Sequence, residues 1–214
     1  MVGKITAGAV SVRGNSALHT DRGECIPTPT KTVEENNQST QELHWYAVRV
    51  FRNRINGIKA QIEASGRETY RPMKVVDAVE GGALRYKEVA LIPALLFLRS
   101  DLTYVKELRY KNFGQMMVYT SAASTEPAPI PDSQMEAFKK ATSAYGNKDV
   151  EVMDDVEGMK LFRAGEPVRV INGIYKGATG VVKRIRHDRK LLVAIEGVAV
   201  IAISKIPMEF LEKI

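Results

Sequence analysis

Cysteine is almost absent from this chain, since Cys25 is the only one among 214 residues. A single cysteine excludes an intramolecular disulfide and any cysteine-rich zinc site. Long apolar runs are missing too: the longest, residues 89–98, is interrupted by Pro93 and falls short of the roughly 20 residues that cross a membrane. The N-terminal residues carry no apolar segment typical of a secretory leader. These absences predict a cytoplasmic protein in a reducing setting, with no membrane contact.

Groups that carry out catalysis are also scarce. None of the three histidines (His19, His44 and His187) has a cysteine or carboxylate at the spacing of metal ligands, and none accompanies a nucleophile. The glycine-rich stretch 173–180 lacks the Gly-Lys-Ser/Thr ending of a phosphate-binding loop. We therefore expect no metal, no cofactor and no enzymatic activity.

Charge is distributed in blocks. The net charge of +6 arises from two basic blocks, residues 43–120 and 161–214, which an acidic stretch at 121–160 separates. This pattern predicts two modules joined by a linker. Basic surfaces favour contact with nucleic acid or acidic partners, although a cationic surface that only interacts with solvent would have the same composition.

Hydrophobic patterning divides the chain further. Residues 1–42 are rich in Thr, Asn, Gln, Gly and Pro and predict a mobile tail. From Leu43 to residue 145, extended and helical patterns alternate in the order β-α-β-β-α-β-α, which predicts an α+β domain with helices packed on an antiparallel sheet. We expect strands near 45–51, 69–76, 84–98 and 115–119, and helices near 55–62, 102–108 and 133–145.

The last third of the chain has a different pattern. Residues 146–160 are acidic, without a sustained apolar face, and predict a flexible linker. Residues 161–214 contain short apolar runs separated by glycines, which favours a small SH3-like β-barrel.

These modules resemble those of NusG-type transcription elongation factors. Residues 45–50, the helix after them and residues 92–98 are similar to the N-terminal domain of that family, and residues 165–182 are similar to its KOW motif. The resemblance covers residues 43–214. Residues 129–136, together with 92–98, look closest to the UpxY-like specialised antiterminators of the Bacteroides group. The matching KOW positions are Gly165, Val168, Val170, Gly173, Gly177, Gly180 and Val181.

The resemblance implies a function in transcription. The N-terminal domain would bind the clamp helices of RNA polymerase through an apolar patch and suppress pausing or termination in selected operons, which for the UpxY-like group are surface-polysaccharide loci. The expected docking residues are Tyr46, Ile92, Pro93, Leu95 and Phe97, unless strand alternation places them in the core. The expected contacts to non-template DNA or nascent RNA, with solvated surface charge as the alternative, are Arg49, Arg52, Arg54, Arg85, Lys87 and Arg99.

Two departures from the family pattern favour a specialised factor over the general one; we expect it to be a monomer. Pro93 is followed by Ala94 and Leu95, where many members have Gly or Asn and then Tyr. The loop expected to recruit the ribosome or Rho lacks the usual Phe and Gly-Arg, and reads Ile195, Glu196, Gly197 and Val198.

An alternative function is direct binding of RNA or the ribosome by the KOW module. Its phosphate contacts would be Lys183, Arg184, Arg186, Arg189 and Lys190, which would otherwise form a solubilising hairpin.

Overall fold

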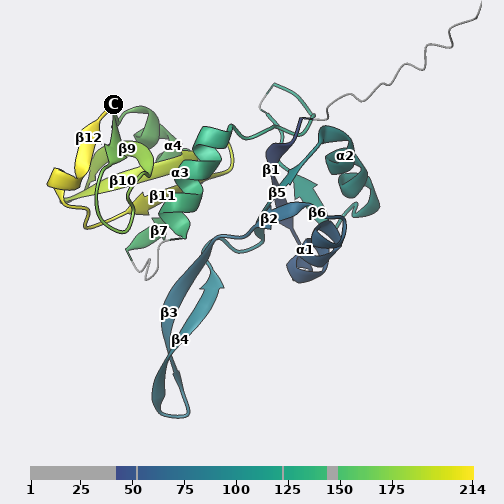
Figure 1. Ribbon diagram of the computed structural model, residues 1–214, viewed down its shortest axis with the longest axis horizontal. Coiled ribbons are helices and arrows are strands. Elements are labelled where there is room, and N and C mark those ends of the chain that lie inside the picture. The colour runs from purple at the N-terminus through teal and green to yellow at the C-terminus, as the bar shows by residue number, and fades with distance from the viewer. Residues whose placement is uncertain (1–41, 52, 122, 144–148) are drawn as a thin grey trace, which may run out of the picture. The chain divides into compact units, whose positions relative to one another are not determined.

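A computed structural model describes residues 42–51, 53–121, 123–143 and 149–214 (Figure 1). The expected mobile tail, with Cys25, and the expected nucleic-acid contact Arg52 lie outside the described residues. Contacts group Ser39–Ile214 into one unit. Its α+β part is followed by a C-terminal all-β sheet region, so the expected fold class is confirmed.

The N-terminal part is built on a four-stranded antiparallel sheet in the order β2-β5-β1-β6. Aromatic and β-branched residues favour the extended conformation of its central strand β1. Alternate side chains of β1 and β5 point to opposite faces of the sheet. The four strands are β1 (His44–Val50), β2 (Glu68–Tyr70), β5 (Leu95–Ser100) and β6 (Met116–Val118).

Helices cover both faces of this sheet. Helices α1 (Ile55–Ala64) and α2 (Leu102–Lys111) pack on the face that carries Tyr46, Val48 and Leu96. Helix α3 (Asp132–Thr142) packs on the opposite face, which carries Trp45, Ala47 and Phe97.

A two-stranded arm leaves this sheet between β2 and β5 (Figure 1). Strands β3 (Met73–Glu80) and β4 (Ala83–Ala90) pair with each other along their whole length. Gly81 and Gly82 connect them with φ of 60° and 81°, a left-handed conformation that glycine adopts at little cost. The arm forms a sheet of its own rather than extending the four-stranded one.

The C-terminal sheet has six strands in the order β12-β8-β9-β10-β11-β7. Every pairing is antiparallel. A short 3-10 helix, η1 (Met208–Phe210), precedes the last strand. The strands are β7 (Val150–Val152), β8 (Glu166–Val170), β9 (Thr179–Ile185), β10 (Asp188–Ile195), β11 (Ala199–Ile203) and β12 (Leu211–Lys213).

The expected flexible linker at 146–160 is wrong from Val150 onward. Strand β7 pairs with β11 there, and helix α4 (Asp155–Arg163) covers an apolar face of the C-terminal sheet. The Asp154 carboxylate accepts hydrogen bonds from the backbone N–H groups of Val156 and Glu157, which caps the helix. A Cβ on Gly158 would lie 2.9 Å from Val200 Cβ, so glycine allows α4 to approach β11 closely.

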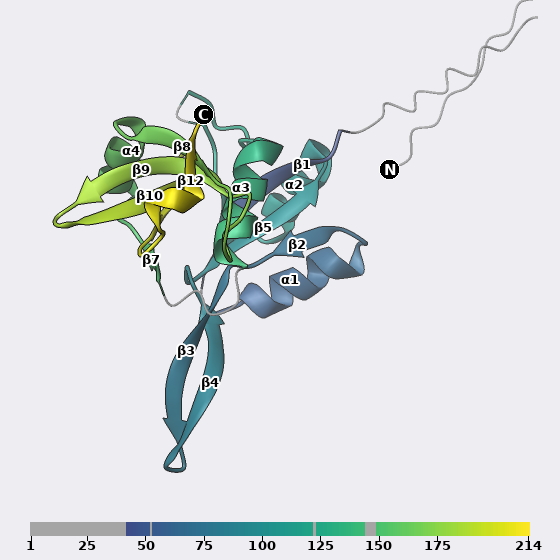
Figure 2. The ribbon, with the colours of Figure 1, turned by 60° about the vertical axis from the view of Figure 1, so that its left-hand side comes forward.

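Helix α3 lies between the N-terminal sheet and the C-terminal sheet (Figure 2). One apolar core contains residues of both sheets and of α3. It includes Trp45 and Phe97 of the first sheet, Phe138 of α3, and Leu191 and Val193 of the second sheet. No helix in the described part of the chain is long and apolar enough to cross a membrane.

Candidate functional site

Three of the five expected docking side chains are buried. Tyr46 packs among residues of α1 and α2, whereas Leu95 and Phe97 lie under α3 on the other face of the sheet. Burial, and then the nearby Asp101 carboxylate, raise the pKa of Tyr46. The expectation that these three side chains form an exposed apolar patch is therefore wrong, because helices cover both faces of the central strands.

Polar contacts anchor α3 over this face. The Lys139 ammonium lies 3.8 Å from the centre of the Trp45 ring and forms a 2.9 Å ion pair with Glu68. The Tyr70 and Thr142 hydroxyls lie 2.5 Å apart in a hydrogen bond. Burial raises the pKa of Tyr70. These contacts hold α3 at both the β1 and β2 sides of the sheet.

Apolar side chains remain exposed at the end of the same sheet face. In the β1 register Arg49 pairs with Leu95 on one side and with Met117 on the other. Met117 is 44% exposed and Phe51, two residues after Arg49, is 39% exposed. Of the two remaining docking candidates, Pro93 is exposed and Ile92 is half-buried.

Backbone hydrogen bonds bring these residues together. The Val50 N–H donates to Ala94 O at 2.8 Å, and the Phe51 N–H donates to Gln115 O at 2.7 Å. Ala94 has a φ of 65°, the left-handed conformation for which glycine and asparagine are preferred. We call Arg49, Phe51, Pro93 and Met117 the sheet-end patch. Sequence reasoning missed Phe51 and Met117, although strand alternation from Arg49 places Phe51 on the same face.

The expected nucleic-acid contacts do not form one continuous surface. Arg49 and Arg99 lie at opposite ends of the sheet, because Arg49 pairs with Leu95 and Arg99 pairs with Trp45. Arg54 precedes α1 and donates to Gln115 Oε1 at 3.0 Å.

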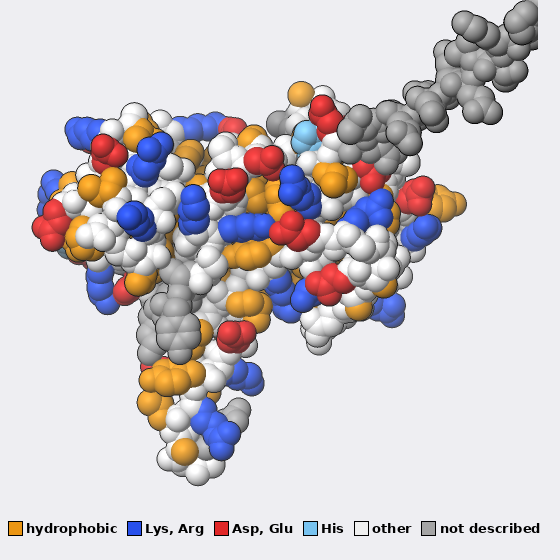
Figure 3. Space-filling view, viewed as in Figure 1, with side chains coloured by type: hydrophobic (Ala, Val, Ile, Leu, Met, Phe, Trp, Pro, Cys, Tyr) orange, Lys and Arg blue, Asp and Glu red, His pale blue; other side chains and the backbone are white. Residues whose placement is uncertain are grey.

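Arg85 and Lys87 lie instead on the arm. The register pairs Lys87 with Val76 and Arg85 with Ala78, so Lys74, two residues before Val76, shares their face. Figure 3 shows basic side chains on the outer part of the arm, with hydrophobic ones alongside.

The glycine and valine positions of the expected KOW motif have structural roles in the C-terminal sheet. Val168, Val170 and Val181 are buried. Gly173 and Gly177 have φ of 81° and 84°. A Cβ on Gly180 would lie 2.2 Å from Leu192 O, and one on Gly165 would lie 2.8 Å from a methyl carbon of Val181. These glycines permit turns and close strand approach.

The expected partner loop contacts other parts of the chain. Ile195 and Val198 are buried, and Gly197 has a φ of 73°. The Glu196 carboxylate forms a 2.8 Å ion pair with Arg163 of α4, and its backbone N–H donates to Gln134 Oε1 of α3 at 3.2 Å. The loop therefore offers little free apolar surface for a partner.

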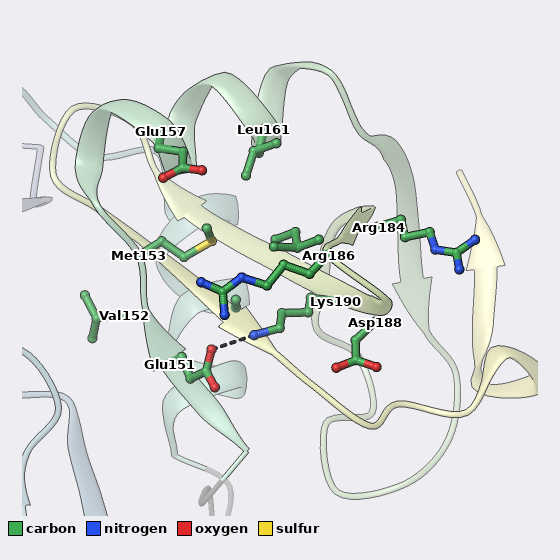
Figure 4. A pocket seen from close by; sticks show the side chains of 11 residues that line it. Glu151, Val152, Met153, Glu157, Leu161, Arg184, Arg186, Asp188 and Lys190 are labelled. Carbon is green, nitrogen blue, oxygen red and sulfur yellow. Dashed lines mark hydrogen bonds and ion pairs between the residues drawn. The ribbon is translucent and has the colours of Figure 1, made fainter.

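A pocket of about 620 Å³ lies between α4, β7 and the β9–β10 hairpin (Figure 4). Lys190 forms a 2.6 Å ion pair with Glu151 across it. Acidic and basic side chains balance in the lining, so the pocket has no excess of positive charge for an anion. Among the described residues no acidic, histidine or cysteine cluster could hold a metal ion. The charged side chains of the lining are Glu151, Glu157, Arg184, Arg186, Asp188 and Lys190.

The fold is thus a helix-flanked antiparallel sheet followed by a C-terminal all-β sheet region, and comparisons with known proteins relate it to transcription factors. Residues 43–139 match the family model described as "Transcription termination factor nusG". The N-terminal part of the chain is therefore similar to the NusG family.

Relatives in this family are distant in sequence. The transcription termination/antitermination protein NusG of Escherichia coli K12 is 25% identical over 161 residues, which cover 69% of this chain and 83% of the relative. The Pseudomonas aeruginosa protein of the same name is 25% identical over 152 residues, covering 70% and 82%. The solved structure "Domain interaction in Thermotoga maritima NusG" is similar over 81% of this chain and 98% of that chain, with 21% identity and a TM-score of 0.41.

Proposed function

We propose that this protein is a specialised elongation and antitermination factor that binds the clamp helices of RNA polymerase and suppresses pausing or termination in selected operons, such as surface-polysaccharide loci. The similarity of residues 43–139 to the NusG family supports the general role. The two departures from the family pattern, at Ala94–Leu95 and at the loop 195–198, support specialisation. The polymerase is the principal partner.

The sheet-end patch is the observation that carries the docking proposal. It combines the exposed apolar groups of Phe51, Pro93 and Met117 with the cation Arg49 on one sheet end. Burying a large apolar side chain fully contributes about 1.5–3 kcal/mol, and covering the exposed portions of Phe51 and Met117 would contribute a fraction of this each. Arg49 adds a charge that can pair with an acidic residue on a helical partner.

The docking experiment introduces a charge where apolar contact is proposed. Phe51→Glu and Met117→Glu should each abolish capture of purified core RNA polymerase by the immobilised protein. Val156→Glu is the control, because Val156 is also an exposed apolar residue but lies on α4 and is not part of the sheet-end patch. Thermal unfolding checks that all three variants fold. Undiminished capture by the folded Phe51→Glu and Met117→Glu variants would contradict the docking proposal.

The arm supplies a nucleic-acid contact in this proposal. Lys74, Arg85 and Lys87 share one face of a two-stranded ribbon, and cations on such a face can neutralise phosphates without reading sequence. Arg54 and Arg99 would contact nucleic acid at separate places, whereas Arg49, which was also expected to contact nucleic acid, belongs to the sheet-end patch.

Direct RNA or ribosome binding by the C-terminal module is the second candidate, and the hairpin cations favour it. The β9–β10 register limits this candidate, because Lys183 pairs with Lys190 and Arg184 pairs with Arg189 on the opposite face. Lys183 also donates to Ala164 O at 3.2 Å. If Arg184→Ser with Arg189→Ser weakens RNA binding by the full chain while polymerase capture is absent in the parent, the second candidate replaces the first.

A further inference from the structure

Two aromatic side chains protrude from the C-terminal end of α2. Tyr110 is 85% exposed and Phe113 is 87% exposed, and they are the two most exposed large hydrophobic side chains of the described residues. Isolated exposed apolar residues are ordinary on protein surfaces. Two highly exposed aromatic rings within one turn are a more specific feature, because such rings can stack with a ligand.

Hydrogen bonds to backbone carbonyl groups hold the turn that carries these two rings in place. The Asn112 N–H donates to Leu108 O at 3.1 Å, and the Phe113 N–H donates to Tyr110 O at 3.3 Å. The second bond spans three residues, and such a turn brings residues three apart to the same side. The buried Asn112 amide also donates from Nδ2 to Leu108 O at 3.0 Å. We call the hydrogen-bonded turn that carries Tyr110 and Phe113 the aromatic turn.

Cations surround the aromatic turn. Arg109 and Lys111 flank Tyr110 in sequence and are exposed. Arg54 reaches the same end of the sheet, where its guanidinium donates to Gln115 Oε1 two residues beyond Phe113. The nearby carboxylate of Glu107 pairs with Lys111 at 3.3 Å, and an exposed pair of this kind adds little stability. Positive charge therefore predominates around the two rings.

We propose that the aromatic turn stacks the bases of single-stranded nucleic acid, while Arg54, Arg109 and Lys111 contact its phosphates. Rings with cations beside them are the combination that sequence-tolerant single-strand binding uses. A protein partner would instead need a contiguous apolar patch, whereas the neighbours of these rings in sequence include the polar Lys111, Asn112 and Gln115. This inference rests on the proposed function in that it adds a base contact to its nucleic-acid surface.

Fluorescence anisotropy with labelled oligo-dT and oligo-rU at low salt tests the proposal on the full chain. Tyr110→Ala and Phe113→Ala should each weaken binding by about 5- to 150-fold, the loss expected for one base stacked on one ring. Phe113→Trp should retain binding because it keeps an aromatic face. Phe113→Leu should weaken binding as much as alanine does, because it keeps apolar volume without that face. Val156→Ala, on α4, is the control for loss of an exposed apolar side chain.

Three results would overturn the proposal. Two of them are binding of both oligonucleotides by the alanine variants as tightly as by the parent, and parent-like binding by Phe113→Leu. Failure of the parent to bind either oligonucleotide would do the same. Capture of core RNA polymerase is measured in parallel with Phe113→Leu. Capture of the polymerase depends on the sheet-end patch. If capture is retained while the oligonucleotides do not bind as expected, only the base-stacking proposal fails. If capture is lost, the proposed function fails.

Discussion

The Phe138 ring of α3 meets the Phe97 ring of β5 edge to face, with centroids 5.6 Å apart and ring planes 61° apart. Both side chains are fully buried. This contact explains why Leu95 and Phe97 of β5 are core residues: α3 covers the face of the strand that would otherwise expose them. Edge-to-face pairs add about 0.5–1.5 kcal/mol to the effect of burial.

Phe138→Ala should lower the free energy of unfolding by about 3–5 kcal/mol, because it removes a buried aromatic ring and leaves a cavity between α3 and the sheet. Urea denaturation followed by circular dichroism measures this change. Val156→Ala, at an exposed site, should change stability by less than about 0.5 kcal/mol. Equal effects of the two substitutions would show that α3 does not pack on β5.

The ion pair between Asp101 and Arg67 should make stability depend on pH. Burial raises the pKa of Asp101, but hydrogen bonds from the Tyr104 N–H at 2.8 Å and from Arg67 at 2.9 Å outweigh burial and lower it. A lowered pKa in the folded state gives stability that is present above the unfolded pKa of about 3.9 and is lost as pH falls through the folded value.

Asp101→Asn should therefore lower stability at pH 7 and flatten its decline as the pH falls below about 4. Urea titrations over this range measure both effects. Asp154→Asn is the control, because it changes the same residue type at the exposed N-terminus of α4, where asparagine caps as well as aspartate. If the stability of Asp101→Asn declined with falling pH as steeply as that of the parent, Asp101 would not be a source of this pH dependence.

Two glycine substitutions should have opposite effects. A Cβ on Gly180 would lie 2.2 Å from the carbonyl oxygen of Leu192, so Gly180→Ala should force β9 away from β10 and cost about 1–3 kcal/mol. A Cβ on Gly57, inside α1, would meet nothing within 4 Å. Gly57→Ala should therefore stabilise the protein by about 0.5–1 kcal/mol. Thermal unfolding of both variants tests the pair, and a shift of the same sign in both would be inconsistent with this packing.

The arm should contribute to the salt dependence of nucleic-acid binding. Replacing Arg85 and Lys87 by serine should reduce the log–log slope of affinity against salt by about 0.7–0.9 for each phosphate that these side chains neutralise in the parent. Their exposure predicts an unchanged unfolding temperature. Titrations of labelled DNA at several salt concentrations measure the slope. The matched control is Arg184→Ser with Arg189→Ser on the C-terminal sheet, which should leave the slope unchanged if the arm binds the phosphates.

Local chemistry made several elements predictable from sequence. The aromatic and β-branched run of β1, the helical spacing of Ile55, Ile58 and Ile62, and the Gly81–Gly82 turn all appear where the pattern indicates. Helix α4 escaped prediction because its acidic residues and Gly158 resemble a linker. Its apolar residues, such as Met159 and Phe162, become informative only where the C-terminal sheet meets them.

The candidate site was less predictable. Alternation along β1 and β5 determines which side chains share a face, but it does not say which element covers that face. Leu95 and Phe97 are buried because α3, about 40 residues later in the sequence, packs across them, whereas Phe51 and Met117 remain exposed at the sheet end. The sequence by itself thus determined the fold class, the resemblance to NusG and the strand periodicity. Only the tertiary structure decided which apolar side chains remain available to a partner, because burial depends on contacts between segments distant in the chain.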